Sequence, residues 1–436
     1  MPVHFPGIKI SRIAFAAFLF ILSSCSLQKK IGKPAAKEVL TAPPLQTALV
    51  GISIYEPATG RYWYNHNADK YFVPASNTKI PTTYAAMKYL GDSLVGLHYH
   101  IVNDTLADIA GTGDPTLLHP DYKQQPVFDF LKRFNTIRYK GDLYDDFLGS
   151  GWAWGDYKAY YMAQRSDLPV YGNIARFKMK ADKTVDVNPP AFQPQTEVIG
   201  TLQKGFRVDK PWDSNRFILT DGNATAAEVP FNPIIGTVLG LLGDTLHRRL
   251  EADMFGNTPS SWKKLYSQPT DSVLRPLMYR SDNFFAEQSL LMVSQALLGE
   301  MNDARIIDTL LKTDFKDLPQ KPRWADGSGL SRYNLFTPQD FVAILQKIKD
   351  EFGMQRIQAI FPTGGTGTLG SYYLDEKGFI YAKTGTLSGV VALSGYLTTK
   401  KNKALIFSVL VNNHNNDAGA VRRAVEKFIK HVRNRY

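Results

Sequence analysis

The sequence predicts an α+β fold, with one five-stranded antiparallel sheet flanked by helices and a mostly β inserted region in the middle of the chain. Two strand-like runs lie near the N-terminus and three lie near the C-terminus. Between 98 and 229 the helical periodicity mostly disappears, and short strand-like runs alternate with frequent turn signals. A sheet shared by both ends brings the termini together, so the middle of the chain is free to host an insertion.

The first elements are a predicted β-hairpin and a helix. Residues 49–55 alternate in hydrophobicity and are rich in β-branched side chains, which predicts a strand. Residues 57–60 read Pro-Ala-Thr-Gly and predict a turn, and 61–65 are expected to form the second strand of the hairpin. A helical stretch then runs from Ser76 to about Leu90 and ends at a glycine.

The last elements are three predicted strands and a helix. The strands occupy 378–383, 390–398 and 404–411. The helix spans 418–435, and its apolar residues fall at helical spacing to form one stripe: Val421, Val425, Phe428, Ile429 and Val432. Such a stripe is typical of a helix that packs one face on a core, so this helix is expected to close the sheet.

Composition excludes several classes of protein. The chain has 436 residues, of which 44% are hydrophobic and 21% are charged, so wholesale disorder is excluded. Its net charge is +11, but no basic helix or aromatic-basic module accompanies it, so nucleic acid is not expected as a partner. An anionic cell wall or membrane surface is the expected neighbour. The scattered histidines form no H-E-x-x-H motif and no cysteine-histidine cluster, so neither a metal nor another cofactor is expected.

The N-terminus predicts export and lipid anchoring. Lys9 and Arg12 precede an apolar run at 13–22, which as a helix would span about 15 Å. A bilayer core is about 30 Å thick, so this run is a signal-peptide segment and not a membrane span. The run leads into Leu-Ser-Ser-Cys, which resembles a bacterial lipobox ending at Cys25, the only cysteine. We expect Cys25 to be lipidated, to become the first mature residue, and to hold the protein on a membrane facing the periplasm.

The domain organisation follows from these observations. Residues 1–24 are the predicted lipoprotein signal peptide, and 25–47 are the lipidated N-terminus with a flexible tether. The predicted catalytic domain is formed by 48–98 together with 255–436. The inserted region occupies 99–254 and is expected to form one or two mostly β subdomains.

Three short motifs occur in a fixed order and carry the predicted chemistry. They are S-x-x-K, S-x-N and K-T-G, at Ser76 to Lys79, Ser281 to Asn283, and Lys383 to Gly385. The first motif alone is uninformative, because it also occurs elsewhere in the chain. The ordered set predicts a serine acyltransferase that uses lysine as its base.

The first motif can supply a nucleophile and its base. Residues three apart on a helix are neighbours, so Lys79 is expected to reach the Ser76 hydroxyl. To accept a proton, Lys79 must be neutral, and lowering its pKa from about 10.4 to about 7 requires about 4.6 kcal/mol. Burial and a second cation can supply this, and Lys383 is the candidate cation.

The other two motifs can bind the substrate and release its leaving group. The Ser281 hydroxyl can pass a proton to a leaving amine, and the Asn283 amide can hold a peptide bond. On the K-T-G strand, Lys383, Thr384 and Thr386 are suited to a substrate carboxylate, and Gly385 lets the backbone approach closely. The backbone N–H groups of Ser76 and Thr386 are the expected oxyanion hole.

The three motifs resemble those of penicillin-binding proteins and serine β-lactamases. Longer segments narrow the resemblance to D-alanyl-D-alanine carboxypeptidases of the class C low-molecular-mass type, peptidase family S13. These segments are residues 73–79, 113–117, 326–332 and 383–389. The long gap between Ser76 and Ser281 also resembles this family, which fills it with inserted domains.

The resemblance covers about 48–436 and implies both fold and function. The implied fold is a penicillin-binding-protein/β-lactamase-like transpeptidase domain. The implied activity is cleavage of the D-Ala-D-Ala bond in peptidoglycan stem peptides through an acyl-enzyme on Ser76, with carboxypeptidase or endopeptidase preference left open. The implied partners are these stem peptides and β-lactam inhibitors.

Two alternatives remain open at this point. A serine β-lactamase shares the motifs, but rapid turnover of a penicilloyl-enzyme needs a dedicated deacylating base, and no class A glutamate motif stands in a suitable place. A catalytically silent, cell-wall-binding lipoprotein is the second alternative, and the intact motif set argues against it.

Several other residues favour structural roles. Asp282 is expected to cap the helix that follows it, and Asp326, Ser328 and Ser331 to support or line the cleft. The sequence at 365–370 matches the dinucleotide pattern G-x-G-x-x-G but lacks a βαβ unit, so nucleotide binding is not expected. A position in the core is favoured over sugar stacking for a group of aromatic residues: Trp152, Trp154, Tyr160 and Tyr161.

Overall fold

The computed structural model describes residues 28–436, apart from 142–143, 255 and 258. Its central feature is a five-stranded, fully antiparallel sheet that joins both ends of the chain, which confirms the predicted fold class. Leu49 near the start pairs with Asn412 near the end. The strand order is β14 (Ile380–Leu387), β15 (Val390–Thr398), β16 (Ala404–Asn412), β1 (Leu49–Glu56) and β2 (Arg61–His66).

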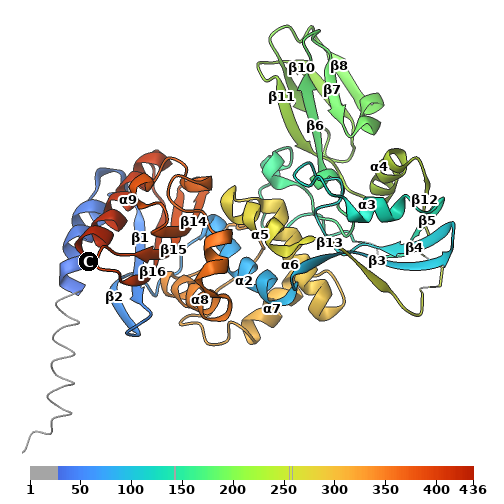
Figure 1. The fold of residues 1–436 in the computed structure, drawn as a ribbon. Coiled ribbons are helices and arrows are strands. Elements are labelled where there is room, and N and C mark those ends of the chain that lie inside the picture. Colours follow the sequence, from blue (N-terminus) through green and yellow to red (C-terminus); the bar gives the residue numbers. More distant parts are fainter. Residues whose placement is uncertain (1–27, 142–143, 255, 258) are drawn as a thin grey trace, which may run out of the picture.

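Each face of this sheet packs against its own layer of helices, because strand side chains alternate between the two faces (Figure 1). On one face, Ile406 and Leu410 of β16 join the core of the main helical layer. On the other face, Phe407 and Val409 pack with the predicted C-terminal helix, α9 (Ala418–Arg435), whose apolar stripe is buried. The main helical layer contains α2 (Lys79–Tyr89), α5 (Thr270–Tyr279), α6 (Asn283–Leu298), α7 (Asp303–Lys312) and α8 (Pro338–Ile360).

The segment before the sheet is not a flexible tether. Residues 28–35 are helical and continue into η1 (Ala36–Leu40) and η2 (Pro43–Leu45). Ile31, Ala35 and Val39 recur every four residues and are buried in the same core as α9. The predicted tether at 26–47 is therefore wrong for 28–45, because an apolar helical stripe fixes this segment to the fold.

The signal peptide and Cys25 lie outside the described residues. Within the described part of the chain, no helix combines the length and the apolar character needed to cross a membrane.

The middle of the chain forms a largely separate β-rich body on the far side of the helical layer from the central sheet (Figure 1). Its base is a second five-stranded sheet in which β5 runs parallel to both of its neighbours. The strand order of this base is β12 (Arg249–Ala252), β5 (Thr136–Tyr139), β4 (Leu106–Ala110), β3 (Ser93–Asn103) and β13 (Lys263–Pro269). Residues 93–269 are called the insert below.

Two three-stranded sheets and two helices complete the insert. One sheet has the order β11 (Ala226–Pro230), β6 (Ile174–Met179) and β7 (Val185–Asn188), and the other β8 (Thr196–Ile199), β10 (Phe217–Asp221) and β9 (Phe206–Asp209). The helices are α3 (Pro126–Leu131) and α4 (Ile235–Leu246). Its core combines aliphatic side chains with buried aromatic rings that contact one another, among them Phe177, Phe192 and Phe217.

The predicted limits of the inserted region, 99 and 254, both lie within the insert: 99 is in strand β3, and 254 lies between β12 and β13. The reason is local: α2 ends at Tyr89, and Gly91, with φ +70°, turns the chain directly into β3 at Ser93. At the other end, β13 pairs with β3 and keeps the chain in the insert until Pro269.

Candidate active site

Ser76 and Lys79 lie where a short 3₁₀ turn enters helix α2. Ser76 is in the turn η3 (Ala75–Thr78), and Lys79 is the first residue of α2. Lys79 Nζ lies 3.3 Å from Ser76 Oγ, so the structure brings the predicted base and nucleophile together. The amine also donates to Asn283 Oδ1 and to the backbone carbonyl of Ser328, both at 2.6 Å. These contacts fix a fully buried amine beside the serine hydroxyl.

The turn that carries Ser76 is held from two sides. Ala75 has φ +47°, a left-handed conformation that is uncommon for a residue with a side chain. The buried Asn77 amide lies 2.7 Å from Ser394 Oγ on β15. On β14, a Cβ atom at Gly385 would lie 2.7 Å from the Pro74 carbonyl oxygen. Glycine is therefore required at position 385, because a larger residue would prevent β14 from packing this closely on the turn that carries Ser76.

Burial makes Lys79 easier to deprotonate. It lowers the pKa of Lys79 to about 8, although the carboxylates of Asp326, Glu287 and Asp282 act in the opposite direction. A pKa of about 8 leaves roughly one Lys79 in ten neutral at pH 7, and the neutral amine is the form that can accept a proton.

Lys383 lies on β14, fully buried, and contacts the second motif. Its Nζ donates to Ser281 Oγ at 2.8 Å and to the Thr384 carbonyl at 2.7 Å. Burial, assisted by the charge of Lys79, lowers the pKa of Lys383 well below its usual range. Ser281 itself has φ +61°, so its hydroxyl is presented from a strained backbone conformation.

Asn283 is the first residue of α6 and links three parts of the molecule. Its Oδ1 accepts from Lys79, and its Nδ2 donates to the backbone carbonyl of Tyr161 in the insert at 2.8 Å. Asp282 caps α6, since its Oδ1 accepts from the Phe285 N–H at 3.0 Å, and the predicted capping role is confirmed.

The outer end of β14 carries the remaining predicted binding residues. Thr384 is half-buried and Thr386 is exposed. The Thr386 hydroxyl accepts a hydrogen bond from Arg422 of α9, a cation that sequence reasoning missed. Arg332 donates to the Ser388 carbonyl at 2.7 Å just beyond the strand. This end of the cleft therefore combines hydroxyl groups with positive charge.

A cavity of about 360 Å³ adjoins the second motif between the insert and α6. It is lined by Ser281 and Asn283 on one side and by insert residues such as Tyr160, Tyr161 and Arg176 on the other. Tyr160 is 63% exposed, and Trp154, in the same segment of the insert, is 62% exposed. The preference for a core position is thus wrong for Trp154, Tyr160 and Tyr161, which are exposed, whereas Trp152 is half-buried.

Comparison with known proteins assigns the chain to a family. Residues 33–432 match the D-Ala-D-Ala carboxypeptidase 3 (S13) family. The chain belongs to this family. Its membership confirms the predicted enzyme class, a D-Ala-D-Ala carboxypeptidase, and the resemblance drawn from the motifs.

Individual relatives support the assignment to the S13 family. The D-alanyl-D-alanine carboxypeptidase of Actinomadura sp. (strain R39) is 28% identical over 446 residues, covering 87% of this chain and 80% of that protein. The crystal structure of penicillin binding protein 4 (dacB) from Haemophilus influenzae matches with a TM-score of 0.73 at 19% identity, covering 92% of this chain and 98% of that one. The same protein complexed with a β-lactam gives a TM-score of 0.69 at 18% identity, with the same coverage. These structural matches show that the S13 enzyme has the penicillin-binding-protein fold.

Sequence reasoning predicted polar side chains that the structure brings together here, but it missed the backbone acceptors that contact them. The carbonyl groups of Ser328 and Tyr161 fix Lys79 and Asn283, yet a carbonyl leaves no mark on the sequence. Among the described residues, no group of three His, Cys, Asp or Glu side chains is placed to hold a metal ion.

Proposed function

We propose that this D-Ala-D-Ala carboxypeptidase works through an acyl-enzyme on Ser76. The observation that carries the proposal is the fully buried Lys79 amine, 3.3 Å from Ser76 Oγ and fixed by two further acceptors. As the Ser76 oxygen attacks the carbonyl carbon of the penultimate D-Ala, its proton passes to neutral Lys79. The N–H groups of Ser76 and Thr386 stabilise the oxyanion that forms.

The other two motifs act in the release of D-Ala and in the binding of the substrate. Ser281, which Lys383 contacts at 2.8 Å, passes its hydroxyl proton to the nitrogen of the departing D-Ala and regains the proton that Lys79 took from Ser76. Water then hydrolyses the ester, and Ser76 regains its proton. Before this, the substrate carboxylate is bound by Lys383, Thr384 and Thr386, and we add Arg422 to this set because it contacts the Thr386 hydroxyl.

The experiment that tests this function is peptide mapping after exposure to benzylpenicillin. One penicilloyl group is expected per protein, on the peptide that contains Ser76, because the drug is attacked by the same nucleophile. The protein is also expected to release D-Ala from a stem pentapeptide, and a crosslinked dimer in the same assay measures endopeptidase action. An adduct elsewhere, or no adduct and no D-Ala, would disprove the proposal. Penicillin turnover at many per second would indicate a β-lactamase instead.

Acylation is expected to follow the titration of Lys79. Only the neutral amine accepts a proton, and its pKa is about 8, so the rate should rise with pH up to about 8. Below that pH the rate should fall about tenfold per pH unit. The check is the second-order rate constant for benzylpenicillin between pH 5.5 and 9.5. A rate that does not change between pH 6 and 8 would contradict the role of Lys79 as base.

We also propose that the protein is exported and anchored by lipid at Cys25, facing the periplasm. The N-terminal charges, the short apolar run and the lipobox-like sequence support this. Ser26 favours the outer membrane. Since the first described residues already pack on the fold, the catalytic domain would stand close to the bilayer.

Replacing Cys25 by serine is expected to prevent lipid attachment and to move the protein from the membrane fraction to the soluble fraction. Multiple acyl chains give stable anchoring, whereas a protein without them has only weak contacts with lipid. The check is metabolic labelling with a fatty acid, followed by fractionation of the inner and outer membranes. Label and membrane association that persist in the variant would contradict the anchor.

A further inference from the structure

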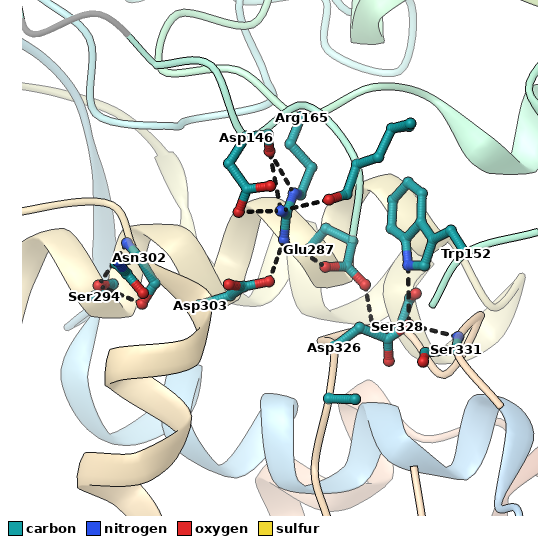
Figure 2. Close-up of polar contacts among 12 residues, drawn as sticks. Asp146, Trp152, Arg165, Glu287, Ser294, Asn302, Asp303, Asp326, Ser328 and Ser331 are labelled. Carbon is teal, nitrogen blue, oxygen red and sulfur yellow. Dashed lines mark hydrogen bonds and ion pairs between the residues drawn. The ribbon is translucent and has the colours of Figure 1, made fainter. Parts of the chain in front are cut away.

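Two carboxylates, Glu287 and Asp326, lie fully buried beside Lys79, and the reaction described above uses neither of them. Glu287 is on α6, one turn after Asn283, and Asp326 begins the loop 326–331, called the Asp326 loop below. Figure 2 shows both groups in a polar network that reaches into the insert. A buried carboxylate is costly unless it is paired or hydrogen-bonded, so this network needs a physical account.

Glu287 contacts the same loop residue that holds Lys79. Its Oε1 accepts from the Ser328 N–H at 2.7 Å, and the Ser328 carbonyl accepts from Lys79 Nζ at 2.6 Å. Ser328 is thus held on one side by Glu287 and presents an acceptor to Lys79 on the other. If the Glu287 oxygen is removed, the Ser328 N–H is left buried without a partner, and the position of its carbonyl is no longer fixed.

Arg165 of the insert faces the other oxygen of Glu287, Oε2, as an ion-pair partner and without a hydrogen bond among the described residues. Arg165 is fully buried, and its guanidinium lies 3.6 Å from Glu287 Oε2. It also pairs with Asp303 of α7 and with Asp146 of the insert, and donates to the Asp146 and Leu148 carbonyls at 2.9 and 3.0 Å. Arg165 therefore joins the insert to α6 and α7 through buried charge.

The same part of the insert contacts Asp326. The Trp152 indole N–H donates to Asp326 Oδ2 at 3.0 Å (Figure 2). Asp326 also accepts from the Gly329 and Ser331 N–H groups and from the Asn334 amide, all between 2.7 and 2.8 Å. Asp326 thus fixes the shape of its loop, and Glu287 fixes the point of the loop that touches Lys79.

We propose that Glu287 is a positioning residue for Lys79, acting through the Ser328 carbonyl, and that the insert holds Glu287 in place through Arg165. The inference rests on the proposed role of Lys79 as base. It makes residues 146–165 of the insert a working part of the active site. The insert is then required for acylation itself, whatever else it binds.

The first test replaces Glu287 by alanine and by glutamine. Glu287→Ala removes the acceptor for the Ser328 N–H, so acylation by benzylpenicillin is expected to slow at least tenfold at every pH. Glu287→Gln keeps an oxygen acceptor, so its highest rate is expected to stay within threefold of the wild-type rate.

Glu287→Gln also removes a negative charge near Lys79, and this gives a second readout. Burial raises the pKa of Glu287 to about 7, so Glu287 is charged near pH 8, where Lys79 titrates, and neutral well below pH 7. A carboxylate favours the ammonium form, so its loss is expected to lower the pKa of Lys79 and to move the upper part of the acid limb to lower pH, with the two profiles meeting below about pH 6. The charged and titratable groups that stay facing Lys79 are Asp282 on α6, Asp326 in its loop and Lys383 on β14. Those that face Glu287 are Lys79, Arg165, Tyr144, Asp303 and Asp326.

Ser294→Ala is the matched control. Ser294 is buried on the same helix and exchanges hydrogen bonds with the Asn302 backbone at 3.0 and 3.1 Å, away from the Asp326 loop (Figure 2). Its loss is expected to lower the unfolding midpoint without slowing acylation. The proposal is overturned if Glu287→Ala acylates within threefold of wild type, or if Ser294→Ala is slowed equally. If Glu287→Ala fails to fold, Glu287→Gln provides the test. The proposal is then overturned if the acid limb of the pH profile of this variant coincides with that of the wild-type protein.

Arg165→Lys tests the contribution of the insert. Lysine keeps the charge but cannot form the forked contacts of a guanidinium, so acylation is expected to slow threefold or more. A rate within twofold of wild type would refute the role of the insert. These outcomes can be distinguished from failure of the proposed function. If the wild-type protein gives no adduct at Ser76, the proposed function fails. If the wild-type protein is acylated at Ser76 and the variants are acylated just as fast, only the present inference fails.

Discussion

Replacing Lys79 by methionine is expected to slow acylation by benzylpenicillin about 10²- to 10⁴-fold, the range that a positioned general base contributes. Methionine fills much of the same buried space but has no amine to accept the Ser76 proton. The three contacts of Lys79, with Ser76, Asn283 and Ser328, are lost together. The measurement is the second-order acylation rate constant at pH 8, with circular dichroism to confirm that the variant is folded.

Lys79→Arg separates the role of a base from the role of a cation. Arginine keeps the positive charge and the hydrogen-bond donors, but it does not lose its proton in proteins. If Lys79 acts only as a charge, the arginine variant should keep much of its activity. We expect it to be as slow as the methionine variant. Acylation within tenfold of wild type in either variant would contradict the mechanism.

The sheet and its helices could be predicted because their signals are local. Alternation at 49–55 and the stripe from Val421 to Val432 depend only on neighbouring residues, and both elements formed as expected. The N-terminal segment carried the same kind of signal, since Ile31, Ala35 and Val39 are spaced by four. Nearby lysines and prolines favoured a tether, and the partner surface on α9 could not be known from that stretch alone.

The limits of the insert and its link to the site could not be predicted, because they depend on contacts between distant parts of the chain. Strand β13 belongs to the insert only because it pairs with β3. Arg165 and Glu287 meet across two domains, and each on its own is an ordinary charged residue in the sequence. The first motif did predict that Ser76 and Lys79 lie close together, because residues three apart in a helical turn are neighbours whatever the rest of the fold does.

The location of the site explains why so many buried polar groups are tolerated. Lys79, Lys383, Glu287 and Asp326 are all fully buried, and each contacts a group from a different element. Removing such charges from water is costly, and the cost is offset only where hydrogen bonds and opposite charges are fixed in place. Packing by the insert on one side and by β14 on the other supplies this fixed environment, and it is also what lowers the pKa of Lys79.

Gly385→Ala is expected to slow acylation about 10²-fold and to destabilise the fold by about 1–3 kcal/mol. The new Cβ would lie 2.7 Å from the Pro74 carbonyl and 3.1 Å from the Ser76 nitrogen, so β14 and the turn η3 must separate. That separation moves Ser76 relative to Lys383 and Thr386, which lie on the same strand as Gly385. The measurements are the acylation rate constant and thermal unfolding, with the rate taken well below the unfolding midpoint.

Gly240→Ala is the control for this substitution, because a Cβ at Gly240 in α4 meets no atom within 4 Å. It should leave acylation unchanged and stabilise the helix slightly, since alanine favours helix more than glycine does. If Gly385→Ala acylates at the wild-type rate, the spacing between β14 and η3 does not control the nucleophile. If it is slow and yet binds a substrate-like peptide as tightly as wild type, the loss lies in the geometry of the attack. That outcome would assign to Gly385 a role in placing Ser76 against the strand that binds the substrate.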